Sequence, residues 1–157
     1  MANTAGVSNN FKWEVMVGLH QLGAVTLVSR TSLTAPTTDT VKAALYLASA
    51  TINNTIAAYT TTGEIATAGG YSAGGVTVTN ATAPSLSGST GVWTPSASIV
   101  YTNITPGANV DCILLYNSTQ SNKSIEVCTF TAQNPVAATL TLTMPTNAAG
   151  TALINIA

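Results

Sequence analysis

The spacing of hydrophobic residues near the N-terminus is helical. Residues at positions i, i+4, i+8 and i+11 share one face of a helix, and here these are Phe11, Val15, Leu19 and Leu22. Ser8 or Asn9 can cap such a helix, and Gly23 can end it. The pattern therefore predicts a short α-helix over residues 9–22.

From about residue 40 to residue 157 the pattern changes from helical to alternating. The stretch TVKAALYLAS (residues 40–49) alternates between two sides, as a half-buried strand does. Further short β-rich runs, separated by Pro, Gly, Asn and Ser, cover residues 75–80, 97–103, 110–117, 124–132, 138–144 and 151–157. This pattern predicts a mainly β fold over residues 1–157, a single-domain antiparallel β-sandwich or jelly-roll-like barrel with a short N-terminal α-helix. Residues 54–71 are expected to form a loop that can include a helical turn.

The composition adds a surface with very little charge. Charged residues make up 6% of the chain, against about 25% in an ordinary soluble protein. Threonine alone occupies 28 positions, so hydroxyl and amide groups must cover most of the surface. A net charge of -1 provides almost no repulsion between copies. We therefore expect a homo-oligomer.

The same composition argues against several classes of partner. Nucleic-acid binding needs clustered cations, but the cations are scattered along the chain at Lys12, Arg30, Lys42 and Lys123. No apolar run approaches the roughly 20 residues that span a bilayer. The N-terminal stretch lacks a basic leader and a continuous apolar region, so we expect folding in a cytoplasm. We expect the five Asn-X-Ser/Thr sequons to be chance products of an Asn- and Thr-rich chain: Asn53, Asn80, Asn103, Asn117 and Asn122.

One glycine-rich stretch, EIATAGGYSAGGVTVTN (residues 64–80), raises the question of a phosphate-binding loop. Such loops lie between a strand and a helix N-terminus, whereas these glycines precede a predicted strand. Neither GxGxxG nor GxxxxGK[ST] is present. We therefore expect no cofactor here, and glycines that permit positive φ angles and close backbone approach.

Catalytic and metal-binding residues are equally sparse. His20 is the only histidine, and no Ser, Asp or Cys lies in a recognisable nucleophile motif, so we expect a surface or packing histidine. Of the acids, only Asp111 and Glu126 can approach each other, across a hairpin. We expect no enzymatic role and no metal site.

Two cysteines call for a geometric test. If residues 110–117 and 124–132 form a hairpin centred near Gln120, residues whose numbers add to 240 face each other, and Cys112 faces Cys128. That register permits a disulfide, and a shift of one residue abolishes it. The alternative is two small buried hydrophobic residues, as a reducing cytoplasm favours.

Aromatic residues offer a second hypothesis of binding. Trp93 lies in a Gly- and Pro-rich stretch (residues 80–98) that is long enough to protrude and carry contacts. With Tyr71 and Tyr101 it can form a contact loop for a glycan. The alternative is that these rings are core and interface anchors.

The order of these motifs resembles small virion structural proteins of tailed bacteriophages. It is carried by FKWEVMVGLHQLG, TVKAALYLAS, GGYSAGGVTVTN, VDCILLYNST and the strand-rich C-terminal end. The resemblance implies a non-enzymatic capsid decoration or cement protein, bound to the major capsid protein or to other virion proteins. The alternatives are a receptor- or glycan-binding module of a tail fibre or spike, and a neck or tail component. The Thr- and Asn-rich stretch of residues 50–67 departs from this pattern by its length.

Overall fold

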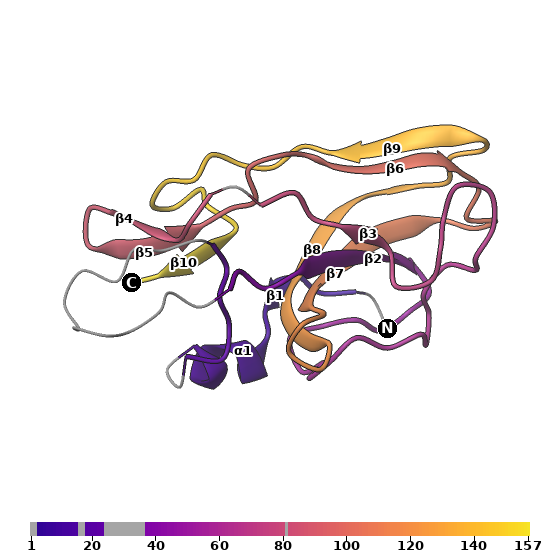
Figure 1. Ribbon diagram of the computed structural model, residues 1–157. Helices are drawn as coiled ribbons and strands as arrows, with labels where there is room; N and C mark the ends of the chain where they lie inside the picture. The colour runs from indigo at the N-terminus through magenta and orange to yellow at the C-terminus, as the bar shows by residue number, and fades with distance from the viewer. Residues whose placement is uncertain (1–2, 16–17, 24–36, 81) are drawn as a thin grey trace.

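The fold is mainly β, with antiparallel sheets and one short helix, as the sequence predicted (Figure 1). The computed structural model describes residues 3–15, 18–23, 37–80 and 82–157. Its elements are β1 (Gly6–Val7), α1 (Asn9–Glu14), β2 (Val41–Leu47), β3 (Val76–Thr77), β4 (Ser85–Ser87), β5 (Thr90–Trp93), β6 (Ile99–Ile104), β7 (Val110–Asn117), β8 (Lys123–Gln133), β9 (Ala138–Leu142) and β10 (Ile154–Ile156).

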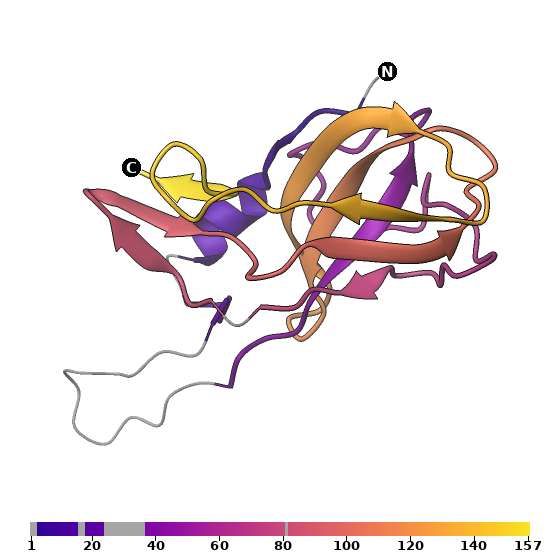
Figure 2. The ribbon, with the colours of Figure 1, turned by 90° about the horizontal axis from the view of Figure 1, so that it is seen from above.

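Three sheets make up the architecture. A five-stranded sheet has the order β1-β8-β7-β2-β3, a three-stranded sheet the order β10-β5-β4, and a two-stranded sheet pairs β6 with β9. The β6–β9 pair lies over one face of the five-stranded sheet, and the three-stranded sheet lies to one side, near α1 (Figures 1 and 2). The main hydrophobic core fills the space between these layers.

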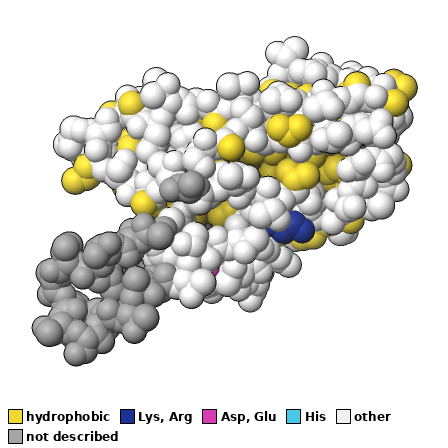
Figure 3. Space-filling view, turned by 45° about the horizontal axis from the view of Figure 1, so that its top comes forward, with side chains coloured by type: hydrophobic (Ala, Val, Ile, Leu, Met, Phe, Trp, Pro, Cys, Tyr) yellow, Lys and Arg dark blue, Asp and Glu magenta, His cyan; other side chains and the backbone are white. Residues whose placement is uncertain are grey.

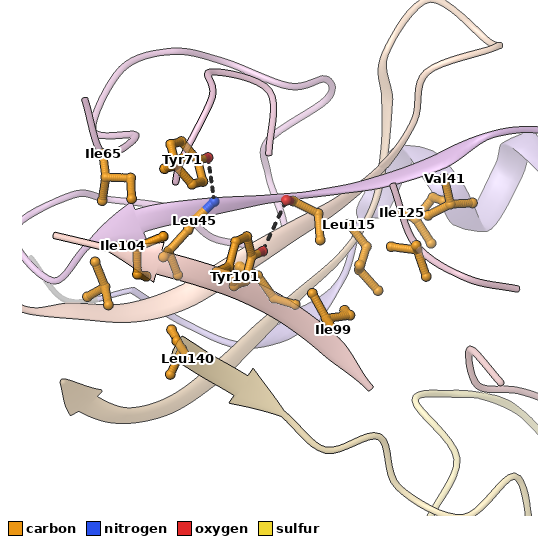
Figure 4. Close-up of a cluster of buried hydrophobic side chains, with 14 of the residues drawn as sticks. Val41, Leu45, Ile65, Tyr71, Ile99, Tyr101, Ile104, Leu115, Ile125 and Leu140 are labelled. Atoms are coloured by element: carbon orange, nitrogen blue, oxygen red, sulfur yellow. Dashed lines mark hydrogen bonds between the residues drawn. The ribbon is translucent and has the colours of Figure 1, made fainter. Parts of the chain in front are cut away.

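The main core is joined to the β2 backbone by two tyrosines. The Tyr101 hydroxyl donates a hydrogen bond to the Ala43 carbonyl at 3.0 Å, and the Leu45 amide donates to the Tyr71 hydroxyl at 3.0 Å (Figure 4). Strand β3 pairs with β2 only at Lys42 and Ala43, so it does not reach Leu45. The Tyr71 hydroxyl accepts the hydrogen bond of the Leu45 amide instead. Both ring bodies remain buried among hydrophobic side chains while their hydroxyls are satisfied.

The second face of the five-stranded sheet is also buried, so the prediction of a half-buried β2 is wrong. Ala44 and Tyr46, on the face opposite the main core, are both 0% exposed. A second hydrophobic cluster covers them and contains Ile52, with Ile56 and Tyr59 packed against it. Residues 48–65, which we call the covering segment, supply these side chains. This segment contains no helix, and a bridge between Ala58 and Lys123 joins it to β8.

The helix is shorter than the predicted residues 9–22. It ends at Glu14, and the Gly18 and Leu19 amides then donate to the Val15 and Glu14 carbonyls, at 3.1 and 3.0 Å. This pair of bonds is typical of a helix C-terminus closed by a residue at positive φ, and Gly18 has φ +72°. The chain therefore leaves the helical path five residues before Gly23.

The segment predicted to be a protruding loop, residues 80–98, contains a hairpin instead. Strands β4 and β5 pair across a two-residue connection, Gly88 and Ser89, and β5 also pairs with β10. Glycine at the first of two loop positions is typical of a type II′ turn, which joins antiparallel strands. The expected loop was wrong because this turn signal lies between strands of only three and four residues.

We expect Gly75→Ala to destabilise the fold strongly. Gly75 has φ +70°, and a Cβ there would lie 1.7 Å from the Ala43 carbonyl oxygen, which is backbone. Positive φ alone costs about 1 kcal/mol for a residue with a Cβ, and the clash should raise the loss of unfolding free energy to about 3 kcal/mol or more. Chemical denaturation measures this loss.

Gly107→Ala is the matched control. Gly107 has φ +79°, but no other side chain or backbone segment lies within 4 Å of the position that an alanine Cβ would take there. Its loss should stay near 1 kcal/mol. Equal losses in the two variants would contradict the steric explanation.

Candidate functional site

A buried polar network surrounds the only histidine. His20 Nε2 lies 2.8 Å from Glu14 Oε2, and His20 Nδ1 lies 3.0 Å from Asn117 Nδ2. Asn117 Nδ2 also donates to Asp39 Oδ2 at 2.6 Å. These partners assign the neutral tautomer with hydrogen on Nε2, because the Asn117 amide must donate to Nδ1. We call Glu14, His20, Asp39 and Asn117 the His20 network.

The His20 network is largely buried, and only His20 of its members lines a groove, one of about 150 Å³ between α1, β5 and β10. The side chains of His20 and Glu14 are 0% exposed, and the His20 ring packs at 4.8 Å from the Phe11 ring. Asp39 accepts a further bond from the Gln21 amide, and Lys123 forms an ion pair with Glu14 at 3.2 Å. The network therefore joins the N-terminal region to the β7–β8 hairpin. This confirms the prediction that His20 has a packing role.

A second network centres on Glu64 in the covering segment. Its carboxylate accepts hydrogen bonds from the Tyr59 hydroxyl at 2.6 Å, the Tyr71 hydroxyl at 2.5 Å and the Gly74 amide at 2.7 Å. We call these four residues the Glu64 clamp. Burial, followed by the bond to Glu64, raises the pKa of Tyr59 and of Tyr71 well above the usual range. Both hydroxyls therefore remain protonated donors.

The clamp answers the question raised by the glycine-rich stretch. The Gly74 amide does bind an anion, but that anion is the carboxylate of Glu64 in the same chain. Gly75 allows close approach to the β2 backbone at the entry to β3, as predicted. The stretch is a turn that starts a strand, and its positive φ angles at Gly69, Gly74 and Gly75 confirm the expected backbone.

Glu126 on β8 is the acid with the most perturbed environment. It lies opposite Leu115 on β7 and Val7 on β1. Its Oε2 atom is buried, with no hydrogen-bond partner among the described residues. Burial raises the pKa of its carboxyl from 4.5 to about 8. The sequence had suggested Asp111 as a neighbour across the hairpin, but Leu115 occupies the opposite position.

The structure corrects the predicted pairing of Cys112 with Cys128. Tyr116 faces Ser124 as expected, but an extra residue in β8 shifts the register, so that Cys112 faces Thr129 and Ile113 faces Cys128. Cys112 belongs to the second cluster and Cys128 packs against the main core, so the thiols lie on opposite faces of the sheet. Both are free cysteines, as the alternative prediction had it.

The predicted contact loop of Trp93, Tyr71 and Tyr101 is also wrong. These side chains are 1%, 3% and 1% exposed. The Trp93 indole donates to the Thr82 carbonyl at 3.3 Å, and Tyr71 and Tyr101 form part of the main core. The alternative prediction of core anchors is therefore confirmed for all three rings.

The open surface of the described residues contains three larger grooves. One of about 380 Å³ lies between α1, β1 and β10, one of about 470 Å³ borders residues 49–63, and one of about 430 Å³ lies between β8 and β9. Among the described residues that line them there is no Asp, Glu or His, and Lys12 is the one charged side chain. Apolar groups and threonine hydroxyls make up most of these linings.

Comparisons with known proteins add no assignment, since no family model, curated protein or solved structure matches the chain. Within the described ranges, no group of three or more His, Cys, Asp or Glu side chains is placed to hold a metal ion. No helix in that part of the chain is long and apolar enough to cross a bilayer. Sequence reasoning missed both polar networks, because their members lie far apart in the chain or at spacings without a known motif.

Both thiols should resist modification in the folded protein. Burial raises the pKa of Cys112 to about 12 and that of Cys128 well above its usual range, so neither forms the reactive thiolate near neutral pH. Alkylation followed by intact-mass measurement should add no label to the native protein and two labels after denaturation. A mass that rises by two hydrogens on reduction would contradict the observed register.

Glu126→Gln should change how stability depends on pH. The folded carboxyl keeps its proton up to pH about 8, whereas the unfolded one loses it near pH 4.5. Because the unfolded state releases its proton first, stability falls as pH rises from 4.5 to 8 and stays low above that range. The variant lacks this fall and should be more stable than the natural protein above pH 8, by about 5 kcal/mol.

Denaturation series at several pH values measure this difference. At pH 4 both proteins carry a neutral side chain at position 126, so their stabilities should agree, which is the internal control. The same slope in both proteins between pH 5 and 8 would show that another group causes it.

Proposed function

We propose that this chain is a non-enzymatic structural protein of a bacteriophage virion, a decoration or cement protein that binds the outer surface of the capsid shell in many copies. The observation that supports an adhesive role is the division between interior and surface. The acids and histidine of the His20 network and the Glu64 clamp are bound to partners in the same chain. The larger grooves present apolar and hydroxyl groups.

The surface suits many weak contacts between neutral partners. Figure 3 shows a face that is mostly white, with yellow hydrophobic patches and very few charged side chains. Four large hydrophobic residues are exposed: Leu86 77%, Val136 72%, Ile156 55% and Val100 42%. Leu86 and Ile156 flank Gly91 on one face of the three-stranded sheet. Copies with a net charge of -1 repel one another little. On a symmetric shell such contacts add through avidity, which can exceed a single affinity by about 10²–10⁴-fold.

The placement on a capsid, and with it the localisation in a virion assembled in the host cytoplasm, comes from the sequence resemblance to phage virion proteins. A neck or tail component fits the same neutral surface. A glycan-binding module fits less well, because Trp93, Tyr71 and Tyr101 are buried and cannot stack on a sugar. We therefore keep the major capsid protein as the proposed partner.

Co-sedimentation with empty shells of the phage that encodes the chain tests this proposal. We expect saturable binding at a fixed number of copies per shell, and gold-labelled antibody on the shell surface of intact virions. Shells of an unrelated phage serve as the control. Protein that remains in the supernatant at saturating concentration, or antibody found only on tails, would overturn the capsid assignment.

A further inference from the structure

We infer that two copies of this chain associate by pairing the free edges of their β9 strands. The inference deepens the proposed function, because it names a surface through which copies join, but it concerns the protein in solution and needs no shell. It rests on the hydrogen bonding, regularity and surroundings of β9.

Strand β9 has an unpaired edge. It pairs with β6 on one side, through Ile99 with Leu142, Tyr101 with Leu140 and Ile104 with Ala138. No described strand pairs with its other side, where the backbone amides and carbonyls of β9 point away from β6. Such a row of unpaired groups is a template for another strand.

Access to this edge is open. The groove of about 430 Å³ between β8 and β9 borders it, and its lining includes Phe130, Leu142 and Met144 with threonines from both strands. Another extended strand would find apolar contacts here as well as backbone partners. Thr139 and Thr141 are exposed while Leu140 is buried, so the two faces of β9 are already distinct.

The other edges of the described sheets are shorter or irregular. Strands β1 and β3 contain two residues each, and β4 and β10 three each. The C-terminal end of β8 has a longer free edge, but extra residues in β8 shift its register against Val110 and Cys112 of β7. Such a bulge protects an edge from pairing. In the β6–β9 pair the extra residue lies in β6, where Asn103 has φ +54°, so β9 itself is regular.

The occupant that fits this edge is a second copy of the same chain. Ala138–Leu142 contains no charged residue and no proline, the two side-chain devices that usually block edge pairing. An antiparallel pair of identical strands about a two-fold axis is self-complementary. The near-neutral chain adds little repulsion between the copies.

Full overlap of the two strands fixes the register. It places Leu140 on the two-fold axis and Thr139 opposite the second copy's Thr141. Leucines of both copies then lie on one face, and threonine pairs, which are favourable across strands, lie on the other. The result is a continuous sheet in the order β6-β9-β9-β6.

Charge placed on these threonines tests both the interface and the register. Sedimentation equilibrium of the natural protein at low salt should show a dimer. Thr139→Lys with Thr141→Lys places like charges opposite each other and should weaken dimerisation at least tenfold. Thr139→Glu with Thr141→Lys places Glu opposite Lys and should retain the dimer. Thr77→Lys with Thr79→Lys, at exposed positions in and after β3, is the matched control and should also retain it.

Thermal unfolding of each variant checks that the fold persists, so that a lost dimer is not a lost fold. A monomeric natural protein at millimolar concentration, or a double-lysine variant that dimerises as tightly as the control, would overturn the inference. A Glu/Lys variant as monomeric as the double-lysine variant would overturn the register. Dimers that do not bind shells would remove only the proposed function, and monomers that do bind shells would remove only this inference.

Discussion

The carboxylate of Glu64 is the interaction on which the sheet's second face depends. The five-stranded sheet has hydrophobic residues on both faces, but the β6–β9 pair covers only one of them. The covering segment must cover the other face without a helix or a regular strand of its own. Glu64 fixes that segment by accepting bonds from Tyr59, Tyr71 and Gly74, and Tyr59 then stacks on Tyr116 at 4.8 Å between ring centres. Hydrogen bonds to a charged group are roughly twice as strong as neutral ones, so one carboxylate can hold an irregular segment in place.

The same use of charge recurs at the N-terminal end and bears on function. Glu14 binds His20 and Lys123, and Asn117 donates to both His20 and Asp39, which avoids the large cost of burying a charge without partners. A chain with only five acids and one histidine has thus placed three of these side chains in one buried network and a fourth in the clamp. The described surface is left with few charged side chains, and such a surface recognises partners mainly by shape, apolar contact and backbone pairing.

The strands were predictable because alternation is local, and β7 was found at its predicted bounds. Features set by distant contacts were not predictable. Ile125 is an extra residue in β8 that shifts the cysteine register, and nothing in the local pattern marks it as such. The helix end at Glu14 depended on which of two glycines, Gly18 or Gly23, adopts positive φ. Burial of β2 on both faces required knowing where the covering segment lies, since Lys42, Ala44 and Tyr46 are also compatible with a solvent-facing side.

A shortage of charge also explains why one strand edge of the described sheets is left unprotected. Soluble β proteins usually protect edges with lysine, proline or bulges. This chain has only three lysines, and none lies on β9: Lys12 lies on α1, Lys42 within β2, and Lys123 pairs with Glu14. Among the described strands, bulges lie in β6, β7 and β8, whereas β9 is regular. The composition therefore leaves this chain few side chains that could block strand pairing at the free edge of β9.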